Sequence, residues 1–147
     1  MTLPLAEGLT LGVQTIHRRT EPSTERWTPS WPDGRDVVEL VDWLGFDSIW
    51  VGDHLAFSIP LLDPVVQLSQ AAVLSSRLKI GTSVFLQPLR HPGPTAKQIA
   101  TLDLLSNGRF IFGLGVGVEF ESDFSVAGVP IAERGSRLSE SIEVMRK

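Results

Sequence analysis

Short apolar runs alternate along the chain with stretches whose apolar residues recur at helical spacing. The runs predict strands at residues 9–14, 46–52, 78–86 and 109–117. Helical spacing and capping residues predict helices at residues 35–44, 63–75 and 95–105, and a last helix with Leu138, Ile142 and Met145 on its apolar face. Four strand–helix units in succession predict an α/β fold with parallel strands joined by right-handed crossovers.

The predicted loops that follow the strands are long, and those that return from helix to strand are short. In parallel α/β architectures the functional site lies at the carboxyl ends of the strands, so we expect the active face there. The longest loop, residues 17–34, contains Trp27 and Trp31, which either form the wall or lid of a substrate pocket or anchor the loop. Four units make half of an eight-stranded barrel, and spacing alone leaves a flavodoxin-like open sheet as an equal alternative.

Composition narrows the class of protein. The chain has 147 residues, 42% of them hydrophobic, which is enough for a single domain with a core. A formal net charge of −4 with scattered basic residues does not predict the basic surface that binds nucleic acid. Cysteine is absent and no apolar run approaches the roughly 20 residues of a membrane span, so we expect a cytoplasmic protein. The three histidines lie on different predicted loops, and no metal site is expected.

Polar and small residues near the ends of the predicted strands are candidates for chemistry. Asp53 and His54 follow the second strand, where the histidine is either a general acid or base or a hydrogen-bonded structural residue. Glycines on one face of the fourth strand either open a channel for a flat ligand or relieve crowding: Gly113, Gly115 and Gly117. The acidic residues of the next loop either transfer protons or are simply solvated: Glu119, Glu121 and Asp123.

Three segments carry a resemblance to a known family. They are GFDSIWVGDHL at residues 45–55, LKIGTSVFLQPLRHPGPTAKQIATLDLLSNGRFIFGLGVG at residues 78–117 and GVPIAERGSRLSE at residues 128–140. In this order and spacing they resemble the luciferase-like monooxygenase superfamily, and most closely its oxidoreductases that use the deazaflavin coenzyme F420. The resemblance runs from Leu9 to the C-terminus. It implies a TIM-type (β/α)8 barrel, of which residues 1–147 form the N-terminal half as one partial domain of four βα units.

The resemblance also implies roles for residues near the second and third strands. Asp53 is expected to line the cofactor pocket. His54 is expected near the redox-active ring, where it assists hydride or proton transfer. Ser83 and Val84 match the position of a non-prolyl cis peptide that forms a bulge behind the ring. The resemblance thus implies a ring backed by the Ser83–Val84 bulge and lying beside His54.

The fourth strand carries the other implied contacts. Val116 and Gly117 match the segment that runs along the cofactor, with Gly115 beside them. A sugar-phosphate dehydrogenase branch of the family has a catalytic glutamate directly after that glycine, whereas this chain has Val118 and then Glu119. Glu119 is therefore the second catalytic candidate, and a sugar phosphate is disfavoured as the substrate.

The combined expectation is an oxidoreductase that transfers a hydride between coenzyme F420 and a small organic substrate. One alternative keeps the fold and is an FMN-dependent monooxygenase that uses O2. The other is a non-catalytic, truncated half-barrel. Family members run to roughly twice this length and TIM barrels typically need about 250 residues, so we expect a fragment or truncated product. Its open strand edges and inner face predict a homo-oligomer without nucleic-acid or membrane partners.

Overall fold

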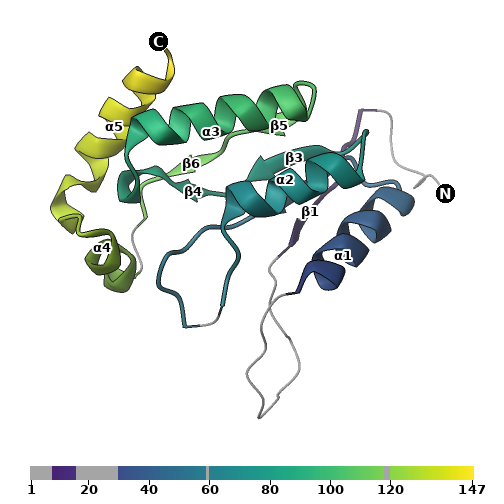
Figure 1. The fold of residues 1–147 in the computed structure, drawn as a ribbon, viewed down its shortest axis with the longest axis horizontal. Coiled ribbons are helices and arrows are strands. Elements are labelled where there is room, and N and C mark those ends of the chain that lie inside the picture. Colours follow the sequence, from purple (N-terminus) through teal and green to yellow (C-terminus); the bar gives the residue numbers. More distant parts are fainter. Residues whose placement is uncertain (1–7, 16–29, 59, 118–119) are drawn as a thin grey trace.

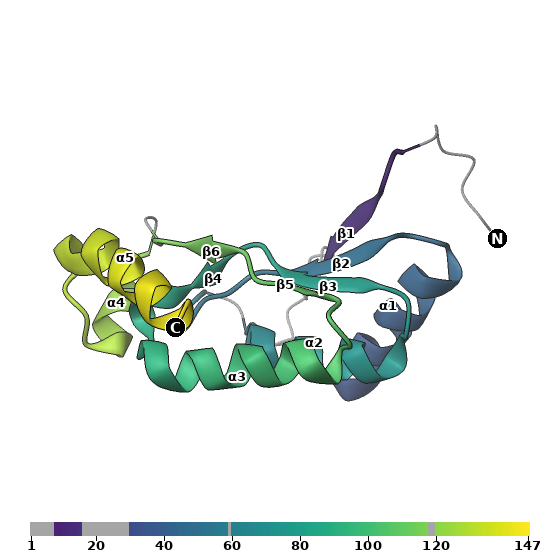
Figure 2. The same ribbon diagram turned by 90° about the horizontal axis from the view of Figure 1, so that it is seen from above.

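The main sheet has four parallel strands covered on one face by three helices. The computed structural model describes residues 8–15, 30–58, 60–117 and 120–147. The strand order is β1-β2-β3-β5, with β1 (Gly12–Thr15), β2 (Ser48–Val51), β3 (Lys79–Thr82) and β5 (Phe110–Ile111). The covering helices are α1 (Trp31–Trp43), α2 (Pro64–Leu74) and α3 (Pro92–Leu105) (Figures 1 and 2). The predicted succession of parallel βα units is confirmed.

A second, two-stranded ladder extends the sheet beyond the carboxyl ends of β3 and β5. β4 (Phe85–Leu86) follows β3, β6 (Leu114–Gly115) follows β5, and the two pair in parallel. The 3-10 helix η1 (Gln87–Leu89) comes directly after β4. Beyond this ladder, at one end of the molecule, lie α4 (Glu121–Ala127), the 3-10 helix η2 (Ile131–Glu133) and α5 (Arg134–Met145) (Figure 2). Helix α5 packs against α3 and η1.

Strand register divides the main sheet into a packed face and an open face. Parallel pairing aligns four residues in one row across the strands, and all four pack into the main core beneath the helices: Val13, Ile49, Ile80 and Phe110. The helices contribute Val38, Val41, Leu68, Ala71 and Leu102 to this core. The adjacent row faces the other way: Gln14, Trp50, Gly81 and Ile111. Ile111 is 40% exposed, and none of α1, α2 and α3 covers this face (Figure 2).

Two glycines make room for Trp50 on the open face. A Cβ atom at Gly81 would overlap the six-membered ring of Trp50, and one at Gly12 would lie 2.7 Å from Trp50 Nε1. The indole Nε1 donates a hydrogen bond of 2.9 Å to Ser48 Oγ. The indole thus lies across β1, β2 and β3, and a side chain at Gly12 or Gly81 would collide with it.

Helix α1 begins four residues earlier than the spacing of apolar residues predicts. Ser30 Oγ accepts a hydrogen bond from the Asp33 N–H, and the Asp33 carboxylate accepts one from the Ser30 N–H, which completes a capping box. The predicted start at residue 35 followed the apolar positions and missed this cap. Helix α3 likewise begins at Pro92, capped by His91, and not at residue 95. Trp27 and the rest of residues 16–29 lie outside the described residues.

The third and fourth predicted strands are each divided in two. Between β3 and β4 the Ser83–Val84 peptide bond is cis, as the family resemblance implies. Between β5 and β6, Thr82 Oγ1 donates to the Gly113 carbonyl (2.8 Å) and accepts from the Gly113 N–H (3.0 Å). A Cβ atom at Gly113 would overlap the Thr82 carbonyl oxygen, so glycine is required for this contact. Helix α4 was also missed, because its polar sequence resembles a loop.

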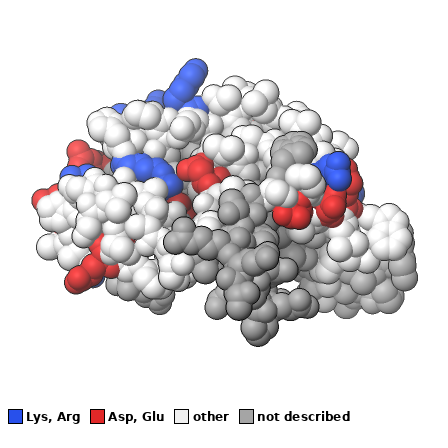
Figure 3. All heavy atoms as spheres, turned by 60° about the horizontal axis from the view of Figure 1, so that its bottom comes forward, with Lys and Arg blue, Asp and Glu red and all other residues white. Residues whose placement is uncertain are grey.

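Charged side chains form small, separate groups on the face shown in Figure 3, with no continuous basic surface among the described residues there. Several described charges pair locally, as in Arg35–Asp36, Arg77–Asp42 and Arg137–Glu133. Within the described ranges, no helix combines the length and apolar character that crossing a membrane requires.

Candidate functional site

A cavity of about 490 Å³ lies at the carboxyl ends of the strands. Its walls come from the end of β1, the segment after β2, the junction of β3 and β4, and the segment from β6 to α4. The described site residues that the sequence predicts all line it: Asp53, His54, Ser83, Val84, Gly115, Val116 and Gly117. Glu119 lies outside the described residues. The cavity volume falls within the range of small-molecule pockets, about 300–1,000 Å³.

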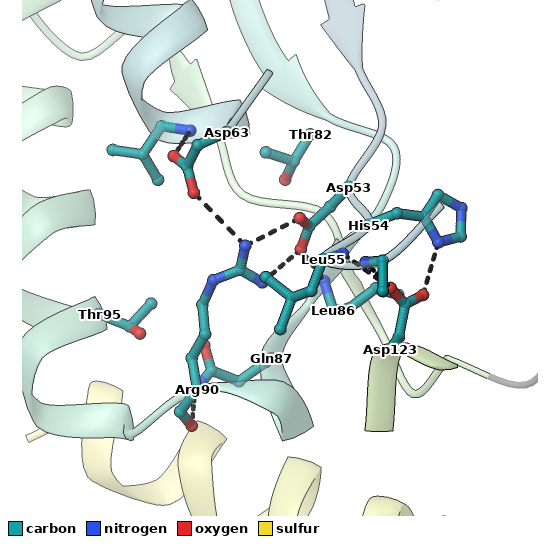
Figure 4. Close-up of polar contacts among 12 residues, drawn as sticks. Asp53, His54, Leu55, Asp63, Thr82, Leu86, Gln87, Arg90, Thr95 and Asp123 are labelled. Carbon is teal, nitrogen blue, oxygen red and sulfur yellow. Dashed lines mark hydrogen bonds and ion pairs between the residues drawn. The ribbon is translucent and has the colours of Figure 1, made fainter. Parts of the chain in front are cut away.

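Asp53 is held at the wall of the cavity by a buried ion pair. Its carboxylate binds both terminal nitrogens of Arg90, at 2.5 Å and 2.8 Å, and accepts a hydrogen bond of 2.8 Å from the Leu86 N–H. The Arg90 guanidinium also lies over the Phe85 ring, 4.3 Å from its centroid. The pair therefore ties the end of β2 to β4 and η1 (Figure 4). Sequence reasoning missed Arg90, because its partner Asp53 lies 37 positions away in the sequence.

His54 is bound to a carboxylate from a distant part of the chain. Its Nδ1 lies 2.7 Å from Oδ2 of Asp123, which sits in the first turn of α4 (Figure 4). The other oxygen, Oδ1, accepts hydrogen bonds of 2.7 Å from the N–H groups of both Leu55 and Ala56. The side chain of Asp123 is only 2% exposed, whereas that of His54 is 26% exposed. Asp123 thus holds His54 in place, and its carboxylate is not a solvent-exposed charge in a loop.

The hydrogen bonds of Asp123 determine its protonation state. Burial alone would raise the pKa of Asp123, but the hydrogen bonds from His54, Ala56 and Leu55 together outweigh burial. The pKa of Asp123 therefore lies below the ordinary value for an aspartate, and the group is a carboxylate at neutral pH. A carboxylate can only accept hydrogen bonds, which fixes the direction of each of its contacts.

Two phenylalanines hold the plane of the His54 ring. Phe57 stacks on the imidazole with ring centroids 4.5 Å apart and an interplanar angle of 16°. Phe120 meets the imidazole edge-on at 5.1 Å and the Phe57 ring edge-on at 4.9 Å. No pattern in the sequence marked Phe57 or Phe120, because single aromatic residues in loops carry no periodic signal. Together they form an aromatic wall beside the imidazole.

The alternating glycines mainly admit neighbouring protein atoms. A Cβ atom at Gly115 would overlap the side chain of Val84, as one at Gly113 would overlap Thr82. Gly117 has a positive φ of +68°, in which a side chain would be strained. Of the two interpretations of this strand, close approach of neighbouring chain segments accounts for Gly113 and Gly115. Gly115 and Gly117 still present their backbone to the cavity.

The composition of the cavity wall suits a flat, largely uncharged ring. Apolar side chains dominate, including Leu61, Leu62, Val84, Val116, Phe120 and Phe124. The charged side chains among the described lining residues are already paired, since Asp53 binds Arg90 and His54 binds Asp123. Two polar side chains of the wall bind the backbone: Gln14 Nε2 donates to the Ser83 carbonyl at 3.0 Å, and Thr15 Oγ1 donates to the Trp50 carbonyl at 3.3 Å. In the same described ranges, no three histidine or acidic side chains converge to hold a metal ion.

Comparison with known proteins finds relatives of this chain. Residues 10–147 match the family model of luciferase-like monooxygenases. The chain is 32% identical over 114 residues to 4-hydroxyprotoasukamycin monooxygenase of Streptomyces nodosus subsp. asukaensis, covering 75% of this chain and 30% of that enzyme. It is 35% identical over 127 residues to F420-dependent glucose-6-phosphate dehydrogenase of Amycolatopsis mediterranei, covering 77% of this chain and 37% of that enzyme.

The fold is similar to that of a solved family member. The crystal structure of monooxygenase RslO1 from Streptomyces bottropensis superimposes with a TM-score of 0.72 at 28% identity, covering 78% of this chain and 35% of that one. The chain spans about a third of the length of the two curated relatives named above. Its fold is therefore part of a luciferase-like TIM-type barrel. Because the family model matches almost all of its residues, the chain belongs to the luciferase-like monooxygenase family of oxidoreductases.

Proposed function

We propose that this chain forms the ring-binding face of an oxidoreductase that transfers a hydride between coenzyme F420 and a small organic substrate. The observation that carries the proposal is the cavity of about 490 Å³ at the strand ends, where His54 lies beside an apolar wall. The relative named for its dependence on F420 supports the choice of cofactor. Because the chain spans about a third of its curated relatives, the activity proposed is that of the whole barrel.

The residues present fit the tricyclic part of such a cofactor. Val84 and Val116 would contact the faces of the ring, and Gly115 and Gly117 would offer backbone without side chains in the way. When bound, the deazaflavin supplies an acceptor and donor for a hydride. No lysine or arginine is among the described residues that line the cavity, and the nearby Arg90 is paired with Asp53. We therefore assign the anionic end of the cofactor to barrel segments beyond these residues.

His54 is the residue that we assign to proton handling. Its Nδ1 is occupied by Asp123, so Nε2 is the ring nitrogen that remains for a ligand. Imidazole is the side chain that most often accepts or releases a proton as a general acid or base in enzymes. The role of Glu119 as the second catalytic group stays a prediction.

An FMN-dependent monooxygenase that uses O2 is the second candidate function. FMN has the same tricyclic ring shape, so the cavity wall suits it equally. The relatives 4-hydroxyprotoasukamycin monooxygenase and RslO1, both named as monooxygenases, favour this candidate. The two candidates differ in the second substrate, because only the monooxygenase consumes O2.

A fluorescence titration of the purified chain with F420 and, separately, with FMN tests the proposal. We expect saturable binding of F420 that is tighter than that of FMN. Tighter binding of FMN, followed by O2 consumption with a reductant, would favour the monooxygenase. Absence of saturable binding for both would support the non-catalytic half-barrel and contradict both enzymatic functions for this chain.

A variant at Gly52 locates the binding site. Gly52 lines the cavity, and a Cβ atom there would meet only the Ser83 carbonyl oxygen, at 4.0 Å. Gly52→Leu should therefore place its side chain in open space beside the cavity and weaken binding by at least about tenfold, or about 1.4 kcal/mol. Gly135→Leu is the matched control, because nothing lies within 4 Å of a Cβ atom at Gly135. Equal affinities of the two variants would place the ligand elsewhere.

A further inference from the structure

Both carboxylate oxygens of Asp123 are engaged by groups of the chain. Its Oδ1 accepts from two backbone N–H groups, those of Leu55 and Ala56, and its Oδ2 faces Nδ1 of His54 (Figure 4). A further bond, from Ser122 Oγ to the Ala56 carbonyl at 2.8 Å, fixes the first turn of α4 to the same loop. With its side chain 2% exposed and bound to Nδ1 of His54, Asp123 is placed to act on a ligand through His54.

These contacts determine which nitrogen of His54 carries the proton. The backbone N–H groups donate, so Oδ1 is an acceptor, and an ionised carboxylate is an acceptor at Oδ2 as well. Nδ1 of His54 must then be the donor across the 2.7 Å contact. In a neutral imidazole the other nitrogen, Nε2, is an acceptor. Nothing else charged competes for the ring among the described neighbours, because Asp53 is bound to Arg90, and Phe57 and Phe120 are aromatic.

We infer that Asp123 is a positioning residue that holds His54 in the Nδ1–H tautomer and thereby presents an unprotonated Nε2 to the cavity as a proton acceptor. The inference rests on the proposed function in one respect, namely that a bound group gives a proton to Nε2. The tautomer itself does not depend on any ligand. Orientation by a carboxylate behind an imidazole is the arrangement that sets the correct tautomer in catalytic triads.

Nitrogen NMR of the purified chain tests the inference without a cofactor. The chain contains three histidines, so the imidazole signals of His54 can be assigned by their loss in a His54→Gln variant. We expect long-range ¹⁵N–¹H correlations in which Nδ1 has the shift of a protonated ring nitrogen and Nε2 that of an unprotonated one. We also expect a downfield Hδ1 proton with a nuclear Overhauser contact to the methylene group of Asp123.

Asp123→Asn should reverse the tautomer. The asparagine oxygen can keep the bonds from Leu55 and Ala56, and its NH2 group then donates to Nδ1, which leaves the proton on Nε2. Asp103→Asn on the exposed side of α3 makes the same chemical change away from the site and should leave the spectrum of His54 unchanged.

Two results would overturn the inference. One is a wild-type His54 protonated on Nε2, and the other is an Asp123→Asn variant whose His54 keeps the Nδ1–H tautomer. If Asp123→Asn does not fold, the wild-type Hδ1 proton decides, because its contact with Asp123 is either observed or not. Failure of F420 and FMN to bind would contradict the proposed function and leave the tautomer result standing, so the two failures are distinguishable.

Discussion

The guanidinium of Arg90 and the carboxylate of Asp53 meet in a two-point ion pair at the wall of the cavity, with contacts of 2.5 Å and 2.8 Å. Arg90→Met removes the cation and leaves a buried carboxylate without its partner. We expect this variant to lower the free energy of unfolding by about 3–5 kcal/mol, measured by urea denaturation. The double variant with Asp53→Asn should recover part of the loss, since the uncompensated charge is gone.

The control for this prediction is an exposed pair at the start of α5, between Arg137 of the helix and Glu133 at its N-cap. Arg137 lies one helical turn from Glu133, and both side chains are substantially exposed. Arg137→Met should cost only about 0.3–0.5 kcal/mol, the usual value for a surface pair one turn apart. Equal losses for Arg90→Met and Arg137→Met would show that burial of the Asp53 pair contributes nothing.

His54→Gln separates the catalytic role of the imidazole from binding. If Nε2 handles a proton, the variant should lower kcat by about 10²- to 10⁴-fold, which is the range for a general acid or base. The affinity for the cofactor should change little, because the cavity keeps its apolar wall. Stopped-flow absorbance of the whole barrel gives kcat, and fluorescence titration gives affinity. A kcat equal to that of the wild type would exclude His54 from catalysis.

Asp123 makes the free energy of unfolding depend on pH in the acidic range. Burial raises the pKa of Asp123, but the hydrogen bonds from His54, Ala56 and Leu55 lower it by a larger amount. The pKa in the folded chain therefore lies below the ordinary value of 3.8. A carboxyl group whose pKa is depressed by folding stabilises the chain above its unfolded pKa, and this contribution is lost as pH falls through the folded pKa. The free energy of unfolding should therefore decrease as the pH falls below about 4.

A comparison of two asparagine variants isolates this contribution. Asp123→Asn has no carboxyl group at the site, so its free energy of unfolding should change less between neutral pH and pH values below 3.8. The exposed Asp103→Asn should keep the steeper decrease of the wild type. Denaturant titrations at a series of pH values measure both. Parallel pH profiles for the two variants would count against the depressed pKa of Asp123.

Two glycine-to-alanine substitutions should have opposite signs. A methyl group at Gly113 would overlap the Thr82 carbonyl oxygen, so Gly113→Ala must shift the backbone and should cost about 1–3 kcal/mol. Gly135 lies inside α5 with open space around it, and Gly135→Ala should stabilise the helix by about 0.5–1 kcal/mol. Thermal denaturation of both variants measures the difference. A neutral Gly113→Ala would mean that β5 and β6 approach β3 less closely.

The sequence predicted the elements that depend on periodic burial. Ile49, Ile80 and Val51 lie in apolar runs, and the strands around them form as expected because burial on the helix side requires those side chains. The Asp53–His54 pair was recognised for the same reason, since polar residues that end an apolar strand are conspicuous. Most of what the sequence did not predict at the site depends on contacts between distant segments.

Asp123 and Arg90 illustrate the limit. Asp123 meets His54 across 69 positions of sequence and Arg90 meets Asp53 across 37, and neither pairing leaves a local pattern. The division of the third strand is a backbone feature that only the family resemblance indicated. The start of α1 was missed although its signal was local, because the capping box of Ser30 and Asp33 precedes the first apolar position.

The two ladders of the sheet rest on separate groups of buried side chains. The main sheet packs on the core of α1, α2 and α3, whereas Leu86 of the second ladder packs with Leu89 of η1 and Phe124 of α4. The scaffold and the rim of the cavity are therefore modular. Exchange of the segments around β4, β6 and α4 can alter the shape of the binding site while the main sheet and its helices stay intact. This independence gives a physical route by which one architecture acquires many chemistries.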